Sequence, residues 1–136
     1  MKTLKAGCIL INKDSKNIAL VYRKKQNDYS FPKGHVEKNE EIIDAAIRET
    51  AEETKRKAEI IKNFEPYVES YKTPSGEDCV CFMYIALDAG ISDNDSQDTH
   101  PVVWTPFEMV EETLSYQSLK DMWNILKEKI AKFLEK

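Results

Sequence analysis

The sequence predicts an α/β protein, an α/β/α sandwich in which helices enclose a mixed β-sheet. Apolar, strand-like runs occur on both sides of one helix-forming segment, Glu41–Lys55, which is rich in alanine and glutamate. A second, strongly amphipathic segment, about Tyr116 to Leu134, closes the chain. Strands from both halves would form one sheet with a helix on each face. At 136 residues the chain is most simply one domain, residues 1–136.

Each expected element has its own signal in the sequence. Turn residues at 12–17 separate two strands and predict an early hairpin, and the apolar run at 78–87 predicts a central strand. The polar segment 88–101 predicts a loop, and a helical turn opens at Thr105. The expected strands are Leu4–Ile11, Ile18–Arg23, Lys57–Phe64, Tyr67–Tyr71, Asp78–Leu87 and Val102–Trp104. The apolar stripe of the last helix comprises Leu119, Met122, Trp123, Leu126, Ile130 and Phe133.

Composition limits the classes of function. The net charge of -4 argues against broad, non-specific nucleic-acid binding, but a metal ion can still bring phosphate to an acidic protein. No segment has the length and apolarity of a membrane span or the apolar core of a signal peptide, so a cytoplasmic location is expected. Cys8, Cys79 and Cys81 predict buried thiols, because His35 and His100 are too scattered to complete a zinc site.

Three glutamates of the first helix share one face. Glu49, Glu52 and Glu53 are spaced i, i+3 and i+4, so their carboxylates lie together and repel one another. A hard divalent cation would offset that repulsion, and all-oxygen ligands are typical of Mg²⁺. The alternative is that a glutamate-rich helix simply presents a solvated face. The opposite stripe, which can pack on a sheet, contains Ile43, Ile47, Thr50 and Thr54.

The residues before this helix extend the pattern. Gly34, Glu40, Arg48-Glu49 and Glu52-Glu53 match the spacing G-x5-E-x7-R-E-U-x-E-E-x-G-U. This spacing resembles the signature of the Nudix hydrolases, which split a nucleoside diphosphate linked to a further group. The resemblance implies the α/β/α fold, an enzyme, and Mg²⁺ or Mn²⁺ as cofactor.

The chain departs from the family pattern at several positions. Lys55 stands where the family has a glycine that ends the helix in a left-handed conformation. Lys55 would either adopt that conformation at a cost of roughly 1 kcal/mol or let the helix continue. Asn39 also stands where many members have glycine, and asparagine tolerates positive φ. Thr50 replaces the usual aliphatic residue.

The resemblance also implies roles for the residues that match. Glu49, Glu52 and Glu53, with the backbone carbonyl of Lys33, would bind the metal that assists water in attacking phosphorus. Arg48 would orient these carboxylates and Glu40 would support it, which completes the expected catalytic group. The general base is left open between a glutamate of the signature and three residues further along the chain. Those three are Asp98, His100 and Glu108.

The run from Tyr29 to Glu37 indicates the substrate class. It resembles a motif found in hydrolases of dinucleoside polyphosphates and of diphosphoinositol polyphosphates, and the second class should need a richer cationic surface. A dinucleoside polyphosphate such as diadenosine tetraphosphate is therefore predicted. The alternatives are an oxidised nucleoside triphosphate, the 5′ end of an RNA, or a catalytically silent Nudix module that only binds.

The expected substrate contacts combine cations and aromatic rings. Arg23 and Lys33 would meet phosphates; the alternative for each is a solvated cation. Aromatic side chains could stack a nucleobase, or could simply belong to the core; they are Tyr29, Phe31, Tyr67 and Tyr84. The expected partner is a small-molecule nucleotide, with no stable nucleic-acid complex, no membrane, and a monomeric or homodimeric state.

Overall fold

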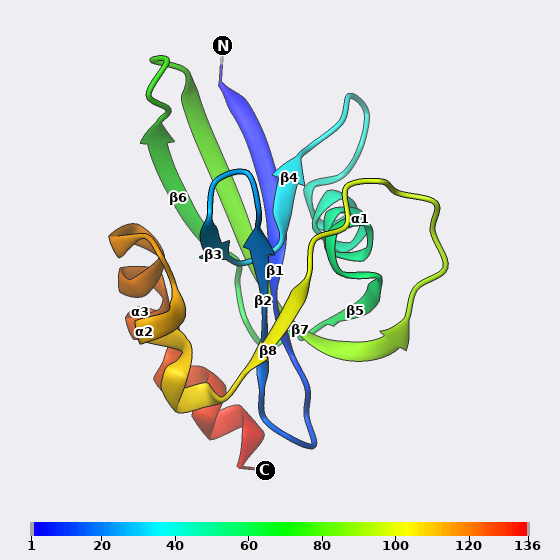
Figure 1. Ribbon diagram of the computed structural model, residues 1–136, viewed down its shortest axis with the longest axis vertical. Helices are drawn as coiled ribbons and strands as arrows, with labels where there is room; N and C mark the ends of the chain where they lie inside the picture. Colours follow the sequence, from blue (N-terminus) through cyan, green and yellow to red (C-terminus); the bar gives the residue numbers. More distant parts are fainter. Residues whose placement is uncertain (1, 136) are drawn as a thin grey trace.

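The structure is a computed structural model that describes residues 2–135. Its sheet contains eight strands, and the longer helices lie on opposite sides of that sheet (Figure 1). The strands are β1 (Thr3–Ile11), β2 (Ile18–Arg23), β3 (Asp28–Ser30), β4 (Lys33–His35), β5 (Arg56–Ile60), β6 (Tyr67–Lys72), β7 (Asp78–Ile91) and β8 (Val102–Thr105). The helices are α1 (Ile42–Thr54), the 3-10 turn η1 (Phe107–Met109), α2 (Val110–Thr113) and α3 (Gln117–Leu134).

The sheet is mixed, as the sequence predicts. Strands follow the order β3-β2-β1-β7-β5, while β4 pairs with β1, β6 with β7 and β8 with β2. β1 and β7 are parallel, and every other pair named here is antiparallel. The long strand β7 is central, because it pairs with β1 along one edge and with both β5 and β6 along the other. The expected fold class is therefore confirmed.

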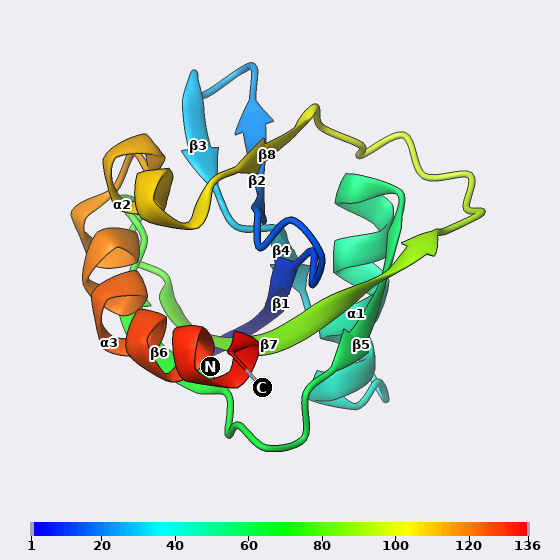
Figure 2. The same cartoon turned by 90° about the horizontal axis from the view of Figure 1, so that it is seen from below.

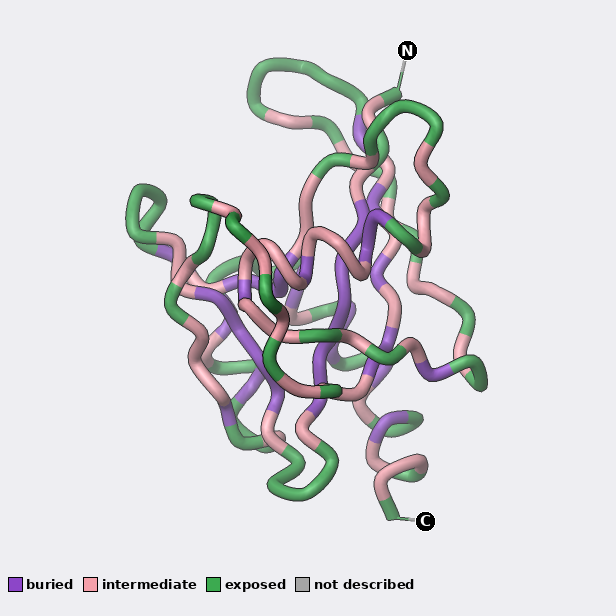
Figure 3. Tube along the Cα trace, turned by 90° about the vertical axis from the view of Figure 1, so that its right-hand side faces the viewer, coloured by how far each residue is buried: buried purple, intermediate pink, exposed green. Residues whose placement is uncertain are grey.

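The sheet is buried on both faces, and Figure 2 shows α3 on one side of it and α1 on the other. Helix α3 covers one face with the predicted stripe, of which Trp123 is 2 % exposed. Side chains of β1 alternate between the faces, so that Ile9 and Ile11 pack toward α3. The buried stretches consequently follow the strands and the inner side of α3, as Figure 3 shows. This core fixes the sheet as a rigid support for the loops.

Helix α1 covers the other face with small side chains. Ala45 and Ala46 pack against Ala6, Cys8 and Leu10 of β1. The expected stripe of α1 was partly wrong, because Thr50 and Thr54 are buried whereas Ile43 and Ile47 are only half-buried. Because Ala45 and Ala46 are small, the backbone of α1 can approach β1 closely, and the contact between helix and strand is centred on these two residues.

Two short strands lie where the sequence indicated only a loop. β4 pairs with β1, and Gly7 is opposite Lys33. A Cβ atom at Gly7 would lie 2.0 Å from the carbonyl oxygen of Pro32, so the close approach of β4 requires glycine there. β5 ends at Ile60, earlier than expected, and β7 continues to Ile91 because its end pairs with Arg56.

Two further expectations concern thiols and membranes. Cys8, Cys79 and Cys81 are free and buried, as predicted. Burial raises the pKa of the Cys8 thiol to about 12 and that of the Cys81 thiol to about 11. Within residues 2–135, no helix has the length and apolarity needed to cross a membrane.

Candidate active site

Arg48 is the centre of a hydrogen-bond network on α1. Its Nε donates to Oε2 of Glu40 at 2.7 Å and its Nη2 to Oε1 of Glu40 at 3.0 Å, a bidentate pair. Nη1 donates to Oε1 of Glu49 and to Oε2 of Glu52, each at 3.2 Å. Nη2 also donates to the backbone oxygen of His35 at 2.9 Å. The network thus joins the helix to β4 and supports the predicted orienting role of Arg48.

Glu40 is itself held by the turn before the helix. The backbone N–H of Glu37 donates to Oε1 of Glu40 at 2.9 Å. Asn39 adopts φ 65°, the positive value expected for it. The hydrogen bonds from Arg48 are the main cause of the lowered pKa of Glu40. His35 contributes its backbone oxygen to this network, in keeping with a role in supporting the loop.

Gly34 makes room for Glu49. A Cβ atom on Gly34 would lie 1.4 Å from Oε2 of Glu49, so any other residue would displace this carboxylate. β4 can pass directly over the middle of α1 only because of this glycine. The contact explains in steric terms why glycine begins the signature pattern.

Replacing Gly34 with alanine is expected to lower Mg²⁺ affinity about tenfold, because Glu49 must rotate away from its present contacts. Isothermal titration calorimetry would measure the change. The matched control is Gly76→Ala, at a turn with φ 89° and no atom within 4 Å of the added Cβ. That control should lose about 1 kcal/mol of stability with unchanged Mg²⁺ affinity. Equal Mg²⁺ affinity in both variants would contradict the role of Gly34.

Glu49 and Glu53 are crowded carboxylates. Burial, followed by the neighbouring carboxylate of Glu52, raises the pKa of Glu49 to about 7. Burial, followed by the charge of Glu49, raises the pKa of Glu53 to about 8. Glu53 also accepts a hydrogen bond from the backbone N–H of Lys33 at 3.3 Å. Two carboxylates whose charged forms are disfavoured therefore lie on α1, with Glu53 beside the start of β4.

The raised pKa values predict a pH dependence of stability. Below pH 4.5, the ordinary pKa of glutamate, Glu49 and Glu53 are protonated in both the folded and unfolded states and contribute nothing. As the pH rises toward 8, the unfolded chain loses these protons first, so the free energy of unfolding falls. Calorimetry of the chelator-treated protein between pH 5 and pH 9 should show Tm falling more for wild type than for Glu53→Gln. Parallel curves would contradict this assignment.

The carboxylate oxygens of Glu49, Glu52 and Glu53 suit a hard cation, although the three groups do not converge on a common position. Within residues 2–135, no group of three or more His, Cys, Asp or Glu side chains is close enough to hold a metal ion. Arg48 holds Glu49 and Glu52, while Glu53 faces the N–H of Lys33. All the donors are oxygens, and one arginine serves three carboxylates, so the residues fit Mg²⁺ or Mn²⁺ by chemistry.

A cavity of about 500 Å³ lies between β6, β7, β4 and the start of α3. Its lining contains four cationic residues and one acidic residue, although Lys72 is also paired with Asp78: they are Lys5, Arg23, Lys33 and Lys72, with Glu69. Burial among other cations lowers the pKa of Lys33. The apolar part of the wall consists of Phe31, Met83, Leu119 and Met122. The cavity therefore combines an apolar floor with a concentration of positive charge.

Arg23 is fixed at the edge of this cavity. Its Nε and Nη2 donate to the two carboxylate oxygens of Asp28 at 2.8 and 2.7 Å. The hydroxyl of Tyr116, the residue before α3, donates to the same buried carboxylate. Hydrogen bonding to Arg23 is the main cause of the lowered pKa of Asp28. Arg23 is consequently pre-oriented, which reduces the entropy lost when it binds an anion.

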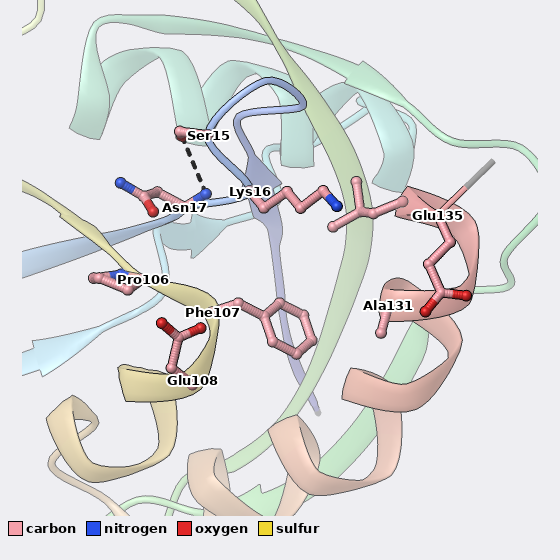
Figure 4. A pocket seen from close by; sticks show the side chains of 9 residues that line it. Ser15, Lys16, Asn17, Pro106, Phe107, Glu108, Ala131 and Glu135 are labelled. Atoms are coloured by element: carbon pink, nitrogen blue, oxygen red, sulfur yellow. Dashed lines mark hydrogen bonds between the residues drawn. The ribbon is translucent and has the colours of Figure 1, made fainter.

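A second hollow of about 380 Å³ lies on the other side of Glu53. Glu49 and Glu53 line it together with Asp98 and His100, two of the three candidate bases. The third candidate, Glu108, lies elsewhere: it lines a pocket between η1 and the end of α3 (Figure 4). We therefore leave Glu108 out of the candidate site.

The remaining predicted substrate residues have different positions. Phe31 lies in the cavity wall and is also core, at 1 % exposed. The ring of Tyr29 packs against Tyr22 with centroids 5.1 Å apart, outside the residues lining the cavity. Tyr84 packs on the apolar cluster beneath α1, on the opposite face of the sheet, and Tyr67 packs on the cluster beneath α3. Neither Tyr29 nor Tyr84 is brought to the cavity.

Several lining residues were missed by the sequence analysis. Lys5, Glu69, Tyr71, Lys72 and Tyr116 all face the cavity. The spacing of two between Glu69 and Tyr71 on a predicted strand is the sequence signal that could have found them. In the structure both are half-buried and share one face of β6. Lys5 and Glu69 both lie opposite Cys81, on β1 and β6 respectively, and only the strand pairing reveals this.

A family model described as the NUDIX domain matches residues 1–129. Among solved structures, the C. elegans Ap4A hydrolase matches with TM-score 0.74 and 24% identity, over 98% of this chain and 99% of that chain. A NUDIX hydrolase from Nitrosomonas europaea matches with TM-score 0.73 and 18% identity, over 97% and 91%. A MutT protein from Methanosarcina mazei Go1 matches with TM-score 0.71 and 12% identity, over 94% of each chain. These likenesses show a shared fold.

Proposed function

The chain belongs to the Nudix family and is a Nudix pyrophosphohydrolase, and from this premise we propose that it hydrolyses a pyrophosphate bond in a dinucleoside polyphosphate such as diadenosine tetraphosphate. Members of the family generally use a divalent metal, and we propose Mg²⁺ or Mn²⁺ here. Glu49, Glu52 and Glu53, with the backbone carbonyl of Lys33, would hold it. When bound, such a metal neutralises phosphate charge and lowers the pKa of a water molecule.

One observation supports this proposal above the others: the larger cavity and the smaller hollow meet at the contact between Lys33 and Glu53. Lys33 lines the larger cavity with its side chain, while its N–H donates to Glu53, which lines the smaller hollow. A phosphate chain crossing this junction would have Lys33 and Arg23 on one side and Lys24 and Lys25 on the other. Glu49 and Glu53, two of the proposed metal ligands, would then lie beside the phosphate chain. This arrangement supports a substrate that extends in both directions from the scissile bond.

The larger cavity supports a nucleoside at one end of that substrate. Its apolar floor can contact a base, and the rings of Tyr71 and Tyr116 lie in its wall. Lys5 lies 5.9 Å from the centre of the Tyr71 ring, so cation and ring are adjacent there. A nucleoside followed by phosphates matches this order of apolar surface, aromatic rings and cations.

The chain's own residues would act by positioning. Arg48 keeps Glu40, Glu49 and Glu52 in one network, which restricts the carboxylates to the side of α1 that faces β4. Lys33 and Arg23 would offset the charge of the phosphates during attack. A glutamate of the signature, Asp98 or His100 would accept the proton of the attacking water.

The test is a substrate panel with Mg²⁺ and with Mn²⁺, with products resolved by ion-exchange chromatography. The panel contains diadenosine tetraphosphate, nucleoside triphosphates including oxidised ones, sugar nucleotides, a 5′-triphosphorylated RNA and a diphosphoinositol phosphate. Preferred cleavage of the dinucleotide to ATP and AMP is the expected result. Preference for a nucleoside triphosphate or for RNA would instead support those alternatives. No turnover by a folded protein that binds metal would favour a role in binding.

A further inference from the structure

Lys55 ends α1 in the left-handed conformation, and its side chain makes an unusual set of contacts. Its φ and ψ are 60° and 28°, and its N–H donates to the oxygen of Ala51 at 2.9 Å. The helix therefore does not continue past Thr54. The ammonium Nζ donates to the backbone oxygen and to Oδ1 of Asn94, at 2.7 and 3.0 Å, and to the oxygen of Ser96 at 3.2 Å. All three donor positions of the ammonium are occupied by one loop.

This loop, residues 92–101 between β7 and β8, also covers the end of α1. The last carbonyls of a helix have no partner within the helix. Here Thr99 Oγ1 donates to the oxygen of Glu52 at 3.0 Å, and Asn94 Nδ2 donates at 2.8 Å to the oxygen of Ala51, which also accepts from the N–H of Lys55. The N–H of His100 donates to the oxygen of Glu53 at 2.9 Å. The backbone of the last turn is thus hydrogen-bonded to the loop at successive residues.

The loop carries two candidate bases to the carboxylates. Asp98 and His100 line the smaller hollow with Glu49 and Glu53. In Figures 1 and 2 the segment leaves β7, passes α1 and returns to the sheet at β8. Hydrogen bonds hold the loop to α1 and to Lys55, and next to β8 the oxygen of Pro101 also accepts one from the N–H of Tyr22 on β2 at 3.0 Å. Between β7 and this contact with β2, the hydrogen bonds to α1 and Lys55 position the part of the loop that contains Asp98 and His100.

We propose that Lys55 is a positioning residue that docks the 92–101 loop onto α1 and thereby holds Asp98 and His100 beside Glu49 and Glu53. The inference rests on the proposed function for its catalytic consequence, but the docking itself does not. Glycine at this position supplies the left-handed backbone without any donor to the loop. Lys55 supplies three donors, together with a positive charge at the negative end of the helix dipole. The chain thus uses the helix-ending residue as an anchor.

The docking is tested by amide hydrogen exchange measured by NMR, without any substrate. Lys55→Gly relieves the left-handed backbone and removes the ammonium, whereas Lys55→Met keeps the backbone requirement and removes only the ammonium. In both variants the amide of His100 should exchange at least tenfold faster, while Lys55→Arg should restore part of the protection. Lys57→Met, which removes an exposed lysine two residues away, is the matched control. Unchanged exchange in both Lys55→Gly and Lys55→Met would overturn the proposal.

The consequence for catalysis is tested by the kinetic parameters of the same variants. Lys55→Gly and Lys55→Met should lower kcat at least fivefold with KM within twofold, because the larger cavity is unchanged. A pH–rate profile should change shape in these variants and keep its shape in Lys57→Met. Faster exchange with wild-type kcat would overturn the positioning role. If wild type hydrolyses nothing in the panel, the proposed function fails, and the exchange rates still decide whether Lys55 docks the loop.

Discussion

Replacing Glu53 with glutamine is expected to lower metal-dependent kcat by about 100-fold or more. Glutamine has nearly the same shape and can still accept the hydrogen bond from the N–H of Lys33. It removes the negative charge that a metal ligand or a base needs at this point. Steady-state kinetics at saturating Mg²⁺ on the preferred substrate of the panel would measure the loss.

Tm of the same variant should stay close to wild type near pH 5 and exceed it as the pH rises, because glutamine avoids the cost of ionising a crowded carboxylate. Its pKa of about 8 means that the charged form is disfavoured in the folded protein. The matched control is Glu59→Gln, which removes an exposed carboxylate from β5 and should change neither kcat nor Tm. If Glu53→Gln retained wild-type turnover, Glu53 would not be a ligand or a base.

Replacing Arg48 with alanine is expected to affect both activity and stability. Glu40, Glu49 and Glu52 would lose their shared cation, and we expect kcat/KM to fall about 100-fold as the carboxylates lose their orientation. Because Arg48 is 26% exposed, the loss of stability should be about 2 kcal/mol, less than for a fully buried pair. Denaturant unfolding and steady-state kinetics would measure the two effects separately.

Arg56 offers a matched control for this variant. Its Nε and Nη2 donate to Asp88 at 3.0 and 2.7 Å, and its side chain is 29% exposed, close to the value for Arg48. Arg56→Ala should therefore lose a similar amount of stability and keep its activity. Equal losses of activity in the two variants would mean that Arg48 acts only through stability.

The carboxylate helix could be predicted because its information is local. The spacing of Glu49, Glu52 and Glu53 fixes their common face, and Gly34 and Arg48 are close to them in sequence. The larger cavity could not be predicted in the same way. Its cations lie on β1, β2, β4 and β6, and only the pairing of distant strands brings them together.

Tyr84 illustrates a second reason. Both faces of the sheet are buried, so an apolar run such as β7 does not reveal which side chains face which helix. The pairing of Cys8 with Tyr84 places this ring beneath α1, while Cys81 and Met83 face the cavity. A shift of one residue in register would have exchanged these roles.

Lys55 illustrates a third reason why part of the structure could not be predicted from the sequence. The local preference of a lysine disfavours the left-handed conformation, and sequence alone left open whether the helix would continue. The contacts of its ammonium with Asn94 and Ser96 act from 39 and 41 residues away. Tertiary contacts of this kind can outweigh the preference of a lysine for a right-handed backbone, and the sequence of the helix alone does not predict them.

The parallel pairing of β1 with β7 also governs the order in which the molecule can assemble. The ladder runs from Thr3 opposite Cys79 to Ile11 opposite Leu87, so more than half of the chain separates its partners. Because so long a loop must close before any ladder contact forms, we expect this ladder to form more slowly than the local contacts of the chain. The local hairpin of β1 and β2 can form early, but it contains only Lys5 and Arg23 of the cavity's cations. We therefore expect the larger cavity to be among the last parts of the protein to form during folding.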